Sequence, residues 1–265
     1  MSGSALHAQP GKGCLYLVPA PLDFGCATEA PLPDALPAST LQTAAQLTHW
    51  VCENAKSTRA YLKRIDALFP LAAPVQQQQI TELPREVHKK GDHGDKGSAP
   101  FDARPLLAAA LAGHDMGLVS EAGMPAVADP GSSVVRAAHD LGVRVVPLVG
   151  PVSLLLALAA SGLNGQNFAF VGYLPQDAQA RTQRIRELES NALKTGQTQL
   201  FIETPYRNAA LWQALVHTLH PHTRLCLASG LTLPDARVQS QLVSQWRQQP
   251  APPDNRTPVV FALGR

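Results

Sequence analysis

The sequence has little charge and few cysteines. Asp, Glu, Lys and Arg make up only 16% of its 265 residues, and the formal net charge is +2. This balance lacks the basic excess of most nucleic-acid-binding proteins, so it neither requires nor excludes an RNA partner. The four cysteines form no C-x-x-C pair, and the histidine cluster HTLHPH has no acid beside it. We therefore expect reduced thiols and no metal site.

We expect neither a signal peptide nor a membrane span in this sequence. Its first residues, MSGSALHAQPGKG, have neither a charged head nor an apolar core. The most apolar stretch, VRVVPLVGPVSLLLALAASGL, is interrupted by Pro147, Gly150 and Pro151. It therefore predicts a strand, a turn and a buried helix rather than an unbroken span. We expect a cytoplasmic protein that does not enter a membrane.

The order of the predicted elements indicates an α/β protein of two domains. In residues 1–150, the strand candidates CLYLVPA, WVCE, MGLVSE and VRVVPLV alternate with helices. This alternation is typical of a mostly parallel sheet that is covered on both faces. Residues 151–265 contain more strands per helix, which predicts a mixed sheet. The segment from Arg85 to Pro100 is rich in Gly and charge, and it predicts a mobile surface loop.

No glycine-rich turn follows the first strand candidate, where the sequence is VPAPLDFG. NAD-dependent enzymes and the common Rossmann methyltransferases require such a turn. Its absence argues against both classes, although Glu53 ends the second strand where those folds hold a ribose.

Ligands of open α/β sheets bind at the carboxyl ends of the strands, and the most informative segment there is SEAGMPAVADPG. Gly123, Pro125 and Pro130 restrict its backbone, and Asp129 can accept N–H bonds. Such a loop can present main-chain groups to a nucleoside. It can equally be an ordinary turn in which Asp129 or Ser132 caps the next helix. The residues alone leave both interpretations open.

Two other features also allow a functional and a structural interpretation. Ser153 follows Gly150-Pro151 and opens an apolar helix, where its hydroxyl could bind a ligand or only cap the helix. Basic residues on two predicted helices could contact RNA phosphate or form solvated faces. These residues are Lys56, Arg59, Lys63, Arg181, Arg184 and Arg186.

The segments SEAGMPAVADPG, PLVGPVSLLLALAASGL, FAFVGYLP and FIETPYRN resemble, in order and spacing, motifs of the tetrapyrrole methylase superfamily. The likeness is greatest to the branch of ribosomal RNA small-subunit methyltransferase I, which methylates a cytidine 2′-hydroxyl. The resemblance implies two α/β domains, S-adenosylmethionine in the cleft between them, and a homodimer. The residues it assigns to the cofactor are Pro19, Gly123, Met124, Pro125, Ser153, Thr204, Pro205, Ala228 and Pro258.

The sequence departs from that family at three places, one of which is the turn after the first strand, where the RNA branch has a glycine-bearing turn and this sequence has VPAPLDFG. Met124 stands where the family has aspartate, or threonine in the RNA branch. The string ENAKSTR stands where the RNA branch has E-D-T-R, so Glu53 matches while Asn54 and Ala55 do not, and Arg59 lies further along.

The expected chemistry is methyl transfer to an oxygen, with RNA as the acceptor. A hydroxyl nucleophile must lose its proton, which requires a base or a cation nearby. The candidates for these catalytic roles are Glu53, Arg59 and Glu121. A tetrapyrrole or other small-molecule acceptor is the first alternative, and the near-neutral charge fits it. The second alternative is a protein that binds the cofactor with weak or no catalysis, which Met124 suggests.

Overall fold

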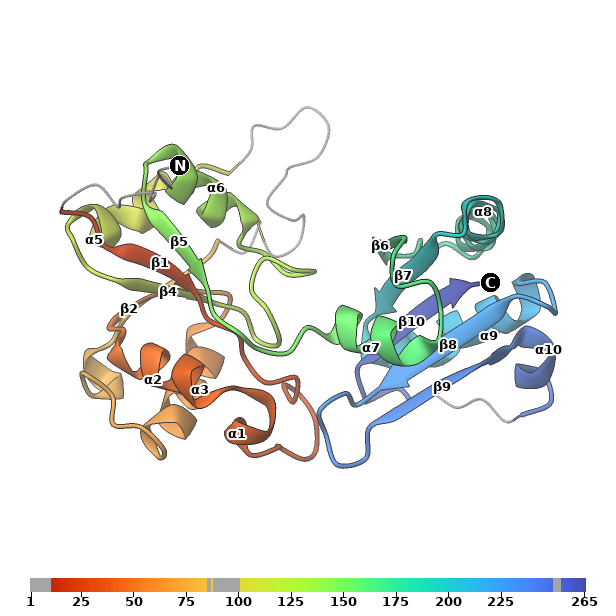
Figure 1. Ribbon diagram of the computed structural model, residues 1–265, viewed down its shortest axis with the longest axis horizontal. Coiled ribbons are helices and arrows are strands. Elements are labelled where there is room, and N and C mark those ends of the chain that lie inside the picture. Colours follow the sequence, from red (N-terminus) through yellow and green to blue (C-terminus); the bar gives the residue numbers. More distant parts are fainter. Residues whose placement is uncertain (1–10, 85–86, 88–100, 250–253) are drawn as a thin grey trace, which may run out of the picture. The chain divides into compact units, whose positions relative to one another are not determined.

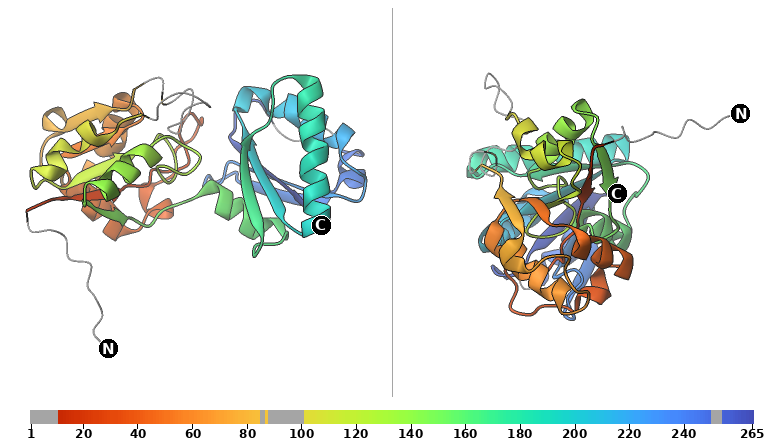
Figure 2. Two further views of the ribbon diagram at one scale, coloured as in Figure 1. Left: turned by 90° about the horizontal axis from the view of Figure 1, so that it is seen from above. Right: turned by 90° about the vertical axis from the view of Figure 1, so that its left-hand side faces the viewer.

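The structure, a computed structural model, describes residues 11–84, 87, 101–249 and 254–265. Most of the loop predicted between Arg85 and Pro100 lies outside the described residues. The chain divides into two compact units, drawn in Figures 1 and 2. Unit 1 comprises the described residues before Gly25 together with Pro31–Pro151, and unit 2 comprises Gly25–Ala30 and Val152–Arg265.

Unit 1 is built on a parallel sheet of five strands. The strands are Cys14–Leu17 (β1), His49–Cys52 (β2), Gln79–Glu82 (β3), Met116–Val119 (β4) and Arg144–Pro147 (β5). Their order is β3-β2-β4-β1-β5, and each pair of neighbours is parallel. The predicted parallel sheet is therefore confirmed. β3 was not predicted, because it is an edge strand whose most buried residue is only half-buried and it has no apolar run.

Helices cover both faces of this sheet (Figure 1). One face carries Leu32–Ala35 (α1), Ala38–Gln46 (α2), Ala55–Asp66 (α3) and the 3₁₀ turn Val75–Gln77 (η1). The other carries Arg104–Leu107 (η2), Ala108–Leu111 (α5) and Ser132–Asp140 (α6). Side chains alternate between the faces, so that Trp50 and Cys52 of β2 pack with α2 and α3 while Val51 packs with α6.

Unit 2 contains a mixed sheet, as the sequence predicts. Its strands are Phe168–Tyr173 (β6), Thr198–Glu203 (β7), Arg224–Ser229 (β8), Arg237–Leu242 (β9) and Val259–Gly264 (β10). The order is β6-β7-β10-β8-β9, in which β6 and β7 are parallel and the other neighbours are antiparallel.

The two faces of the second sheet are covered unequally. The helix Ser153–Ser161 (α7) packs on one face. The other face carries Ala178–Thr195 (α8), Asn208–Thr218 (α9), which follows the 3₁₀ turn Pro205–Arg207 (η3), and Val243–Trp246 (α10). The central strand β10 serves both sides, since Val260 and Ala262 meet α7 while Phe261 and Leu263 meet the larger cluster. Among the described residues, no helix is long and apolar enough to cross a membrane.

Gly117, in the middle of β4, leaves no room for a side chain. A Cβ there would lie 2.4 Å from ring carbons of Trp50, whose side chain is fully buried. We predict that Gly117→Ala lowers the free energy of unfolding by about 1–3 kcal/mol, because the packed ring must shift. The control is Gly165→Ala, whose Cβ would meet no atom within 4 Å. Urea denaturation followed by tryptophan fluorescence checks this, and equal stability of the two variants would contradict it.

Candidate functional site

The neighbouring strands β1 and β4 are followed by connections that run to opposite faces of the parallel sheet. After β1 the chain continues to α1 and α2, and after β4 it continues to α6 on the other face. Ligands of open α/β sheets bind at such a switch point, outside the carboxyl ends of the strands. Here the two loops are joined, since Ala20 N donates to Gly123 O at 2.9 Å and Gly123 N donates to Ala20 O at 3.0 Å.

Gly123 can form this pairing because it is glycine. Its φ is +68°, in the left-handed region that side chains disfavour, and a Cβ would lie 3.1 Å from Leu22 Cδ2. The following Pro125 is buried and Met124 is half-buried. The predicted cofactor loop therefore rests on backbone geometry at Gly123.

Pro19 is held at the same edge from two sides. The Tyr61 hydroxyl of α3 donates to Pro19 O at 2.8 Å, and burial raises the pKa of Tyr61. On the other side Gly150, in the loop after β5, lies so close that a Cβ there would meet Pro19 Cγ at 2.3 Å. The structure thus brings Pro19 and the Gly123 loop to one edge of unit 1, as predicted from their positions in the sequence.

Two of the three predicted catalytic residues meet at this edge. Glu121 N donates to Glu53 Oε2 at 3.3 Å, and both residues are half-buried. Arg59 lies further along α3 with an exposed side chain, and its Nη1 donates to Ala55 O of the same helix at 3.4 Å.

The departure at Asn54 preserves a local structural role. Asn54 is the N-cap of α3, and its Oδ1 accepts from Lys56 N at 2.9 Å and Ser57 N at 3.2 Å. Aspartate caps helices equally well, so asparagine keeps the start of α3 in place directly after Glu53.

Asp129 is a member of the site that sequence reasoning assigned only a structural role. It is half-buried, and burial together with the nearby charges of Glu53 and Glu121 raises its pKa to about 7. The alternative in which Asp129 or Ser132 caps α6 is wrong, because the N-cap is Gly131 at a φ of 132°. No local pattern distinguishes Asp129 from other loop acids, since its environment comes from β2 and β4.

The backbone around Asp129 is unusual. Ala126 and Ala128 have φ values of 64° and 65°, which few residues other than glycine adopt. Such conformations persist only where surrounding structure enforces them, and they concentrate at functional sites.

In unit 2, most of the predicted cofactor residues lie at one sheet edge. Val259, the first residue of β10, pairs with Glu203 at the end of β7 and with Ser229 at the end of β8. Thr204 and Pro205 directly follow β7, Ala228 lies one residue before the end of β8, and Pro258 precedes β10.

A buried carboxylate fixes the loop after β7. The Glu203 side chain is 2% exposed, and its Oε1 accepts from Thr204 N at 2.7 Å, Thr204 Oγ1 at 3.2 Å and Arg207 Nη2 at 2.6 Å. Sequence reasoning missed this residue. The sequence did contain a signal for it: a glutamate directly follows the strand candidate TQLFI, and an arginine stands four residues later.

Asn208 connects that loop to the segment before Pro258. It is fully buried, and its Nδ2 donates to Thr257 O at 2.9 Å and to Asp254 O at 3.3 Å. Its Oδ1 has no hydrogen-bond partner in the described part of the chain. Sequence reasoning also missed Asn208, whose partners lie some fifty positions away in the chain.

Ser153 is the first residue of α7, and the N-cap is Val152. The structural alternative in which Ser153 caps the helix is therefore wrong. α7 packs through Leu154 and Ala157 against a cluster that includes Ala228, so Ser153 begins the helix that covers the strand carrying Ala228.

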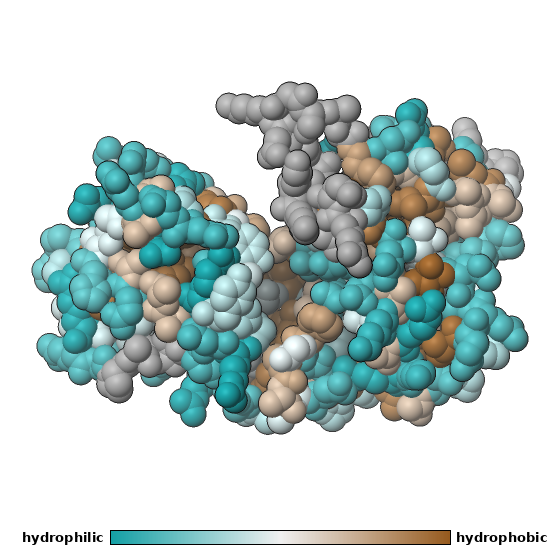
Figure 3. Space-filling view, turned by 180° about the vertical axis from the view of Figure 1, so that it is seen from behind, coloured by the Kyte–Doolittle hydropathy of each residue, from teal (hydrophilic) through white to brown (hydrophobic). Residues whose placement is uncertain are grey.

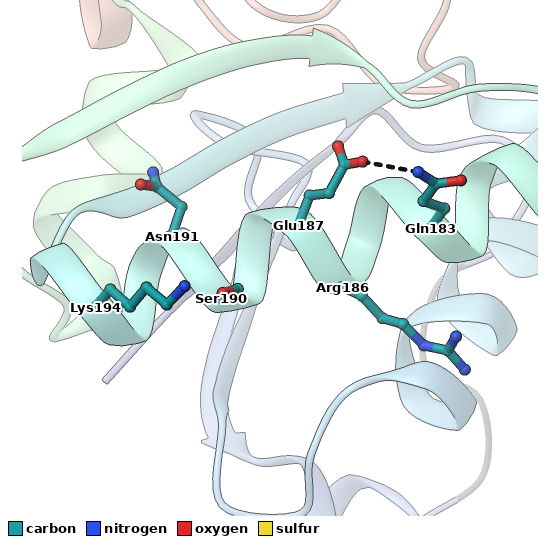
Figure 4. Close-up of a pocket in the computed structure, with 6 residues that line it drawn as sticks. All are labelled: Gln183, Arg186, Glu187, Ser190, Asn191 and Lys194. Carbon is teal, nitrogen blue, oxygen red and sulfur yellow. Dashed lines mark hydrogen bonds between the residues drawn. The ribbon is translucent and has the colours of Figure 1, made fainter.

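One surface pocket lies along α8, shown in Figure 4. All six lining residues come from this helix: Gln183, Arg186, Glu187, Ser190, Asn191 and Lys194. Gln183 Nε2 donates to Glu187 Oε1 at 3.2 Å, and Glu187 also pairs with Arg184 at 3.1 Å. Because a single exposed helix lines this pocket, we assign it no ligand. Among the described residues, no group of three or more His, Cys, Asp or Glu could hold a metal.

The model of a family described as Tetrapyrrole (Corrin/Porphyrin) Methylases matches residues 38–245. A ribosomal RNA small subunit methyltransferase I from Mesorhizobium japonicum is 32% identical over 86% of this chain and 66% of its own length. One from Vibrio cholerae is 33% identical over 62% of this chain and 54% of its own length. The chain thus spans about half to two thirds of the length of these relatives.

Two solved structures share the fold. The methyltransferase CobJ matches with a TM-score of 0.55 and 16% identity, over 96% of this chain and 94% of that one. The native form of uroporphyrin III C-methyl transferase from Thermus thermophilus matches with a TM-score of 0.51 and 17% identity, over 96% and 98% of the two chains.

Asp129 should make stability depend on pH. Its folded pKa of about 7 lies above the unfolded value, so its stabilising contribution is complete below about pH 4 and is lost as the pH rises through 7. We predict that Asp129→Asn removes this decline and is more stable than the wild type at pH 8 by about 1 kcal/mol or more. Urea denaturation from pH 4 to pH 8 checks it, with the exposed Asp140→Asn as control. Parallel wild-type and Asp129→Asn curves would contradict it.

Proposed function

Because the chain belongs to the tetrapyrrole (corrin/porphyrin) methylase family, we propose that it is an S-adenosylmethionine-dependent methyltransferase that methylates an oxygen of RNA. The observation that carries the proposal is the 32% identity, over 86% of this chain, to a relative named ribosomal RNA small subunit methyltransferase I. The joined loops and grouped acids of unit 1 support it, because they lie where ligands of such sheets bind.

The side chains at the unit 1 edge fit a sulfonium cofactor, which is a cation. Glu53, Glu121 and Asp129 gather there, and their carboxylates attract positive charge. The backbone pairing at Gly123 does not involve the side chain at position 124. Methionine at that position therefore removes one possible side-chain hydrogen bond to the cofactor but leaves the backbone of the loop in place.

The cofactor-binding residues that we propose come from both units. They are Pro19, Gly123, Met124, Pro125, Ser153, Thr204, Pro205, Ala228 and Pro258. The Glu203 carboxylate would hold Thr204 in place for this role.

When bound, S-adenosylmethionine supplies an electrophilic methyl group on its sulfonium. The chain must then hold the acceptor oxygen in line, exclude water and accept the hydroxyl proton. We assign proton acceptance to the group formed by Glu53, Glu121 and Asp129. Asp129 suits it best, since a pKa of about 7 is matched to neutral pH. We propose that the guanidinium of Arg59 contacts an anionic part of the acceptor.

We further propose a cytoplasmic homodimer with domains at residues 1–150 and 151–265, as the resemblance to the family implies. A tetrapyrrole or other small-molecule acceptor is the second candidate. The net charge of +2 favours it, because a polyanionic acceptor is usually met by a larger basic excess.

Cofactor binding is the first property to measure. We predict that the wild type binds S-adenosylmethionine and S-adenosylhomocysteine, and that Pro125→Trp and Ser153→Trp weaken binding at least tenfold by filling the space the cofactor needs. Isothermal titration calorimetry of folded proteins checks this. The matched controls Pro70→Trp and Ser190→Trp, at exposed positions, should bind like the wild type. A folded wild type with no affinity for either ligand would refute the proposal.

Methyl transfer identifies the acceptor. We predict that labelled methyl groups pass from S-adenosylmethionine to unmodified ribosomal RNA and leave an alkali-resistant linkage, as a methylated 2′-hydroxyl does. Loss of the proton acceptor through Asp129→Asn should slow transfer by roughly 10²–10⁴-fold when it is measured at saturating S-adenosylmethionine. Transfer to a porphyrin instead would favour the small-molecule acceptor. Binding without transfer to either would leave only a cofactor-binding protein.

A further inference from the structure

The helix α3 carries an excess of positive charge in a chain that is nearly neutral. Its twelve residues include Lys56, Arg59, Lys63 and Arg64 but only one acid, Asp66. The whole chain, by contrast, has a formal net charge of +2. A polar surface by itself marks no site here, because hydrophilic residues predominate over the whole face shown in Figure 3. What distinguishes α3 is the sign of its charge.

Three of these basic residues form one stripe on the outer face of the helix. Lys56, Arg59 and Lys63 follow one another at steps of three and four residues, which places them on one side of an α-helix. All three are exposed, while the opposite side of the helix packs into the core through Leu62 and Ile65. We call the three residues the α3 basic stripe. It is roughly 10 Å long, since an α-helix rises about 1.5 Å per residue.

The α3 basic stripe is left out of the ion pairs of unit 1. None of the ion pairs among the described residues involves its three side chains. The fourth basic residue of the helix differs, because Arg64 Nη2 pairs with Asp23 Oδ2 at 2.9 Å. A solvated helix face is usually mixed in sign, so that acids and bases four residues apart support one another. The stripe instead presents three cations in a row.

The acids at the two ends of α3 are bound to backbone N–H groups. At the start of the helix, Glu82 Oε1 accepts from Ala55 N at 2.6 Å. At its end, Asp66 Oδ1 accepts from Leu71 N at 3.1 Å. Lys56 is the second residue of the helix, where the partial positive charge of the amino end disfavours a lysine. An anionic ligand beside the stripe would reduce this repulsion, so binding explains the stripe better than folding does.

The α3 basic stripe begins at the candidate site of unit 1. Asn54, the N-cap of α3, directly follows Glu53, whose Oε2 accepts from Glu121 N at 3.3 Å. The stripe therefore runs from the first turn of α3, next to the proposed proton acceptors, toward the far end of the helix. An acceptor hydroxyl held at this edge would leave the rest of its molecule free to extend along the stripe.

The charge and shape of the stripe favour a linear polyanion. Lys and Arg are the residues that neutralise the phosphates of nucleic acids, and positive charge that tracks a backbone is typical of sites for single strands. Three cations along an open helix face suit successive phosphates better than one compact anion. An anionic membrane is a poor fit, because an interfacial helix inserts its apolar face, and the apolar face of α3 lies in the core.

We infer that the α3 basic stripe binds the sugar–phosphate backbone of the RNA acceptor, next to the nucleotide that is methylated. Each of the three side chains contacts a phosphate. This inference rests on the RNA acceptor of the proposed function, and it extends the contact from one nucleotide to the strand around it. Because phosphate contacts carry no sequence information, the stripe positions the RNA and does not select its sequence.

Fluorescence anisotropy of the full chain with a labelled single-stranded RNA tests the inference. The dissociation constant of the wild type should rise steeply with salt concentration, because bound phosphates release counterions. The triple variant Lys56→Gln, Arg59→Gln, Lys63→Gln should raise the dissociation constant at least tenfold at low salt. It should also lower the slope of log K against log salt by about 2, since each phosphate contact of a single strand contributes about 0.7.

The control variant removes the same charge elsewhere. Arg186→Gln, Lys194→Gln and Arg237→Gln together replace three exposed basic residues of unit 2. This variant should keep the wild-type slope, and circular dichroism should show that both triple variants are folded. A wild type that does not bind RNA would overturn the inference. So would equal losses in the two variants, because binding would then follow net charge rather than the stripe.

Acetylation of lysine amines in the wild type provides a test without substitution. RNA should protect Lys56 and Lys63 from the reagent, whereas Lys194 on α8 should react equally with and without RNA. Mass spectrometry of peptides measures the extent of reaction at each lysine. Bound RNA that protects neither Lys56 nor Lys63 would overturn the inference.

Calorimetry with S-adenosylmethionine on the same samples separates this inference from the proposed function. A chain that binds RNA through the stripe but has no affinity for the cofactor would support the inference and count against the methyltransferase. A chain that binds the cofactor but no RNA would overturn the inference and leave a methyltransferase with another acceptor.

Discussion

Two backbone hydrogen bonds between Ala20 and Gly123 join loops that otherwise leave the sheet toward opposite faces. A single hydrogen bond contributes only about 1 kcal/mol to stability, so the importance of this pair lies in its position. It closes the edge where β1 and β4 end. Tyr61 holds Pro19 beside it, and Gly150 packs against the ring of Pro19 from the next loop. The candidate site of unit 1 is therefore fixed mainly by backbone contacts.

Unit 2 fixes its corresponding loop by a side chain instead. One oxygen of Glu203 accepts hydrogen bonds from Thr204 and Arg207, and Asn208 extends the connection to Thr257. These two ways of holding a loop differ in which substitutions they tolerate. A loop held by backbone pairing tolerates different side chains, Met124 among them. A loop held by one buried carboxylate depends on that residue.

The acidic group at the unit 1 edge illustrates a conflict between stability and function. Burial first, and repulsion by the nearby charges of Glu53 and Glu121 second, disfavour the charged form of Asp129 and raise its pKa. Folding alone would favour fewer acids there. Groups with strongly perturbed pKa values are common at active sites, where a carboxyl that titrates near neutral pH can accept a proton.

Local patterns were sufficient to predict the two sheets, parallel in unit 1 and mixed in unit 2, because alternation and apolar runs record which faces of an element are buried. They also located Gly123 and Glu53 at strand ends. They missed the exposed edge strand β3 and misplaced the helix caps at Ser132 and Ser153, where flanking backbone conformation decides. Only the tertiary structure revealed that the pKa of Asp129 is raised to about 7 and that Glu203 holds the loop after β7. The reason is that a pKa and a hydrogen-bond network depend on neighbours in space, which strands and loops far apart in the chain supply.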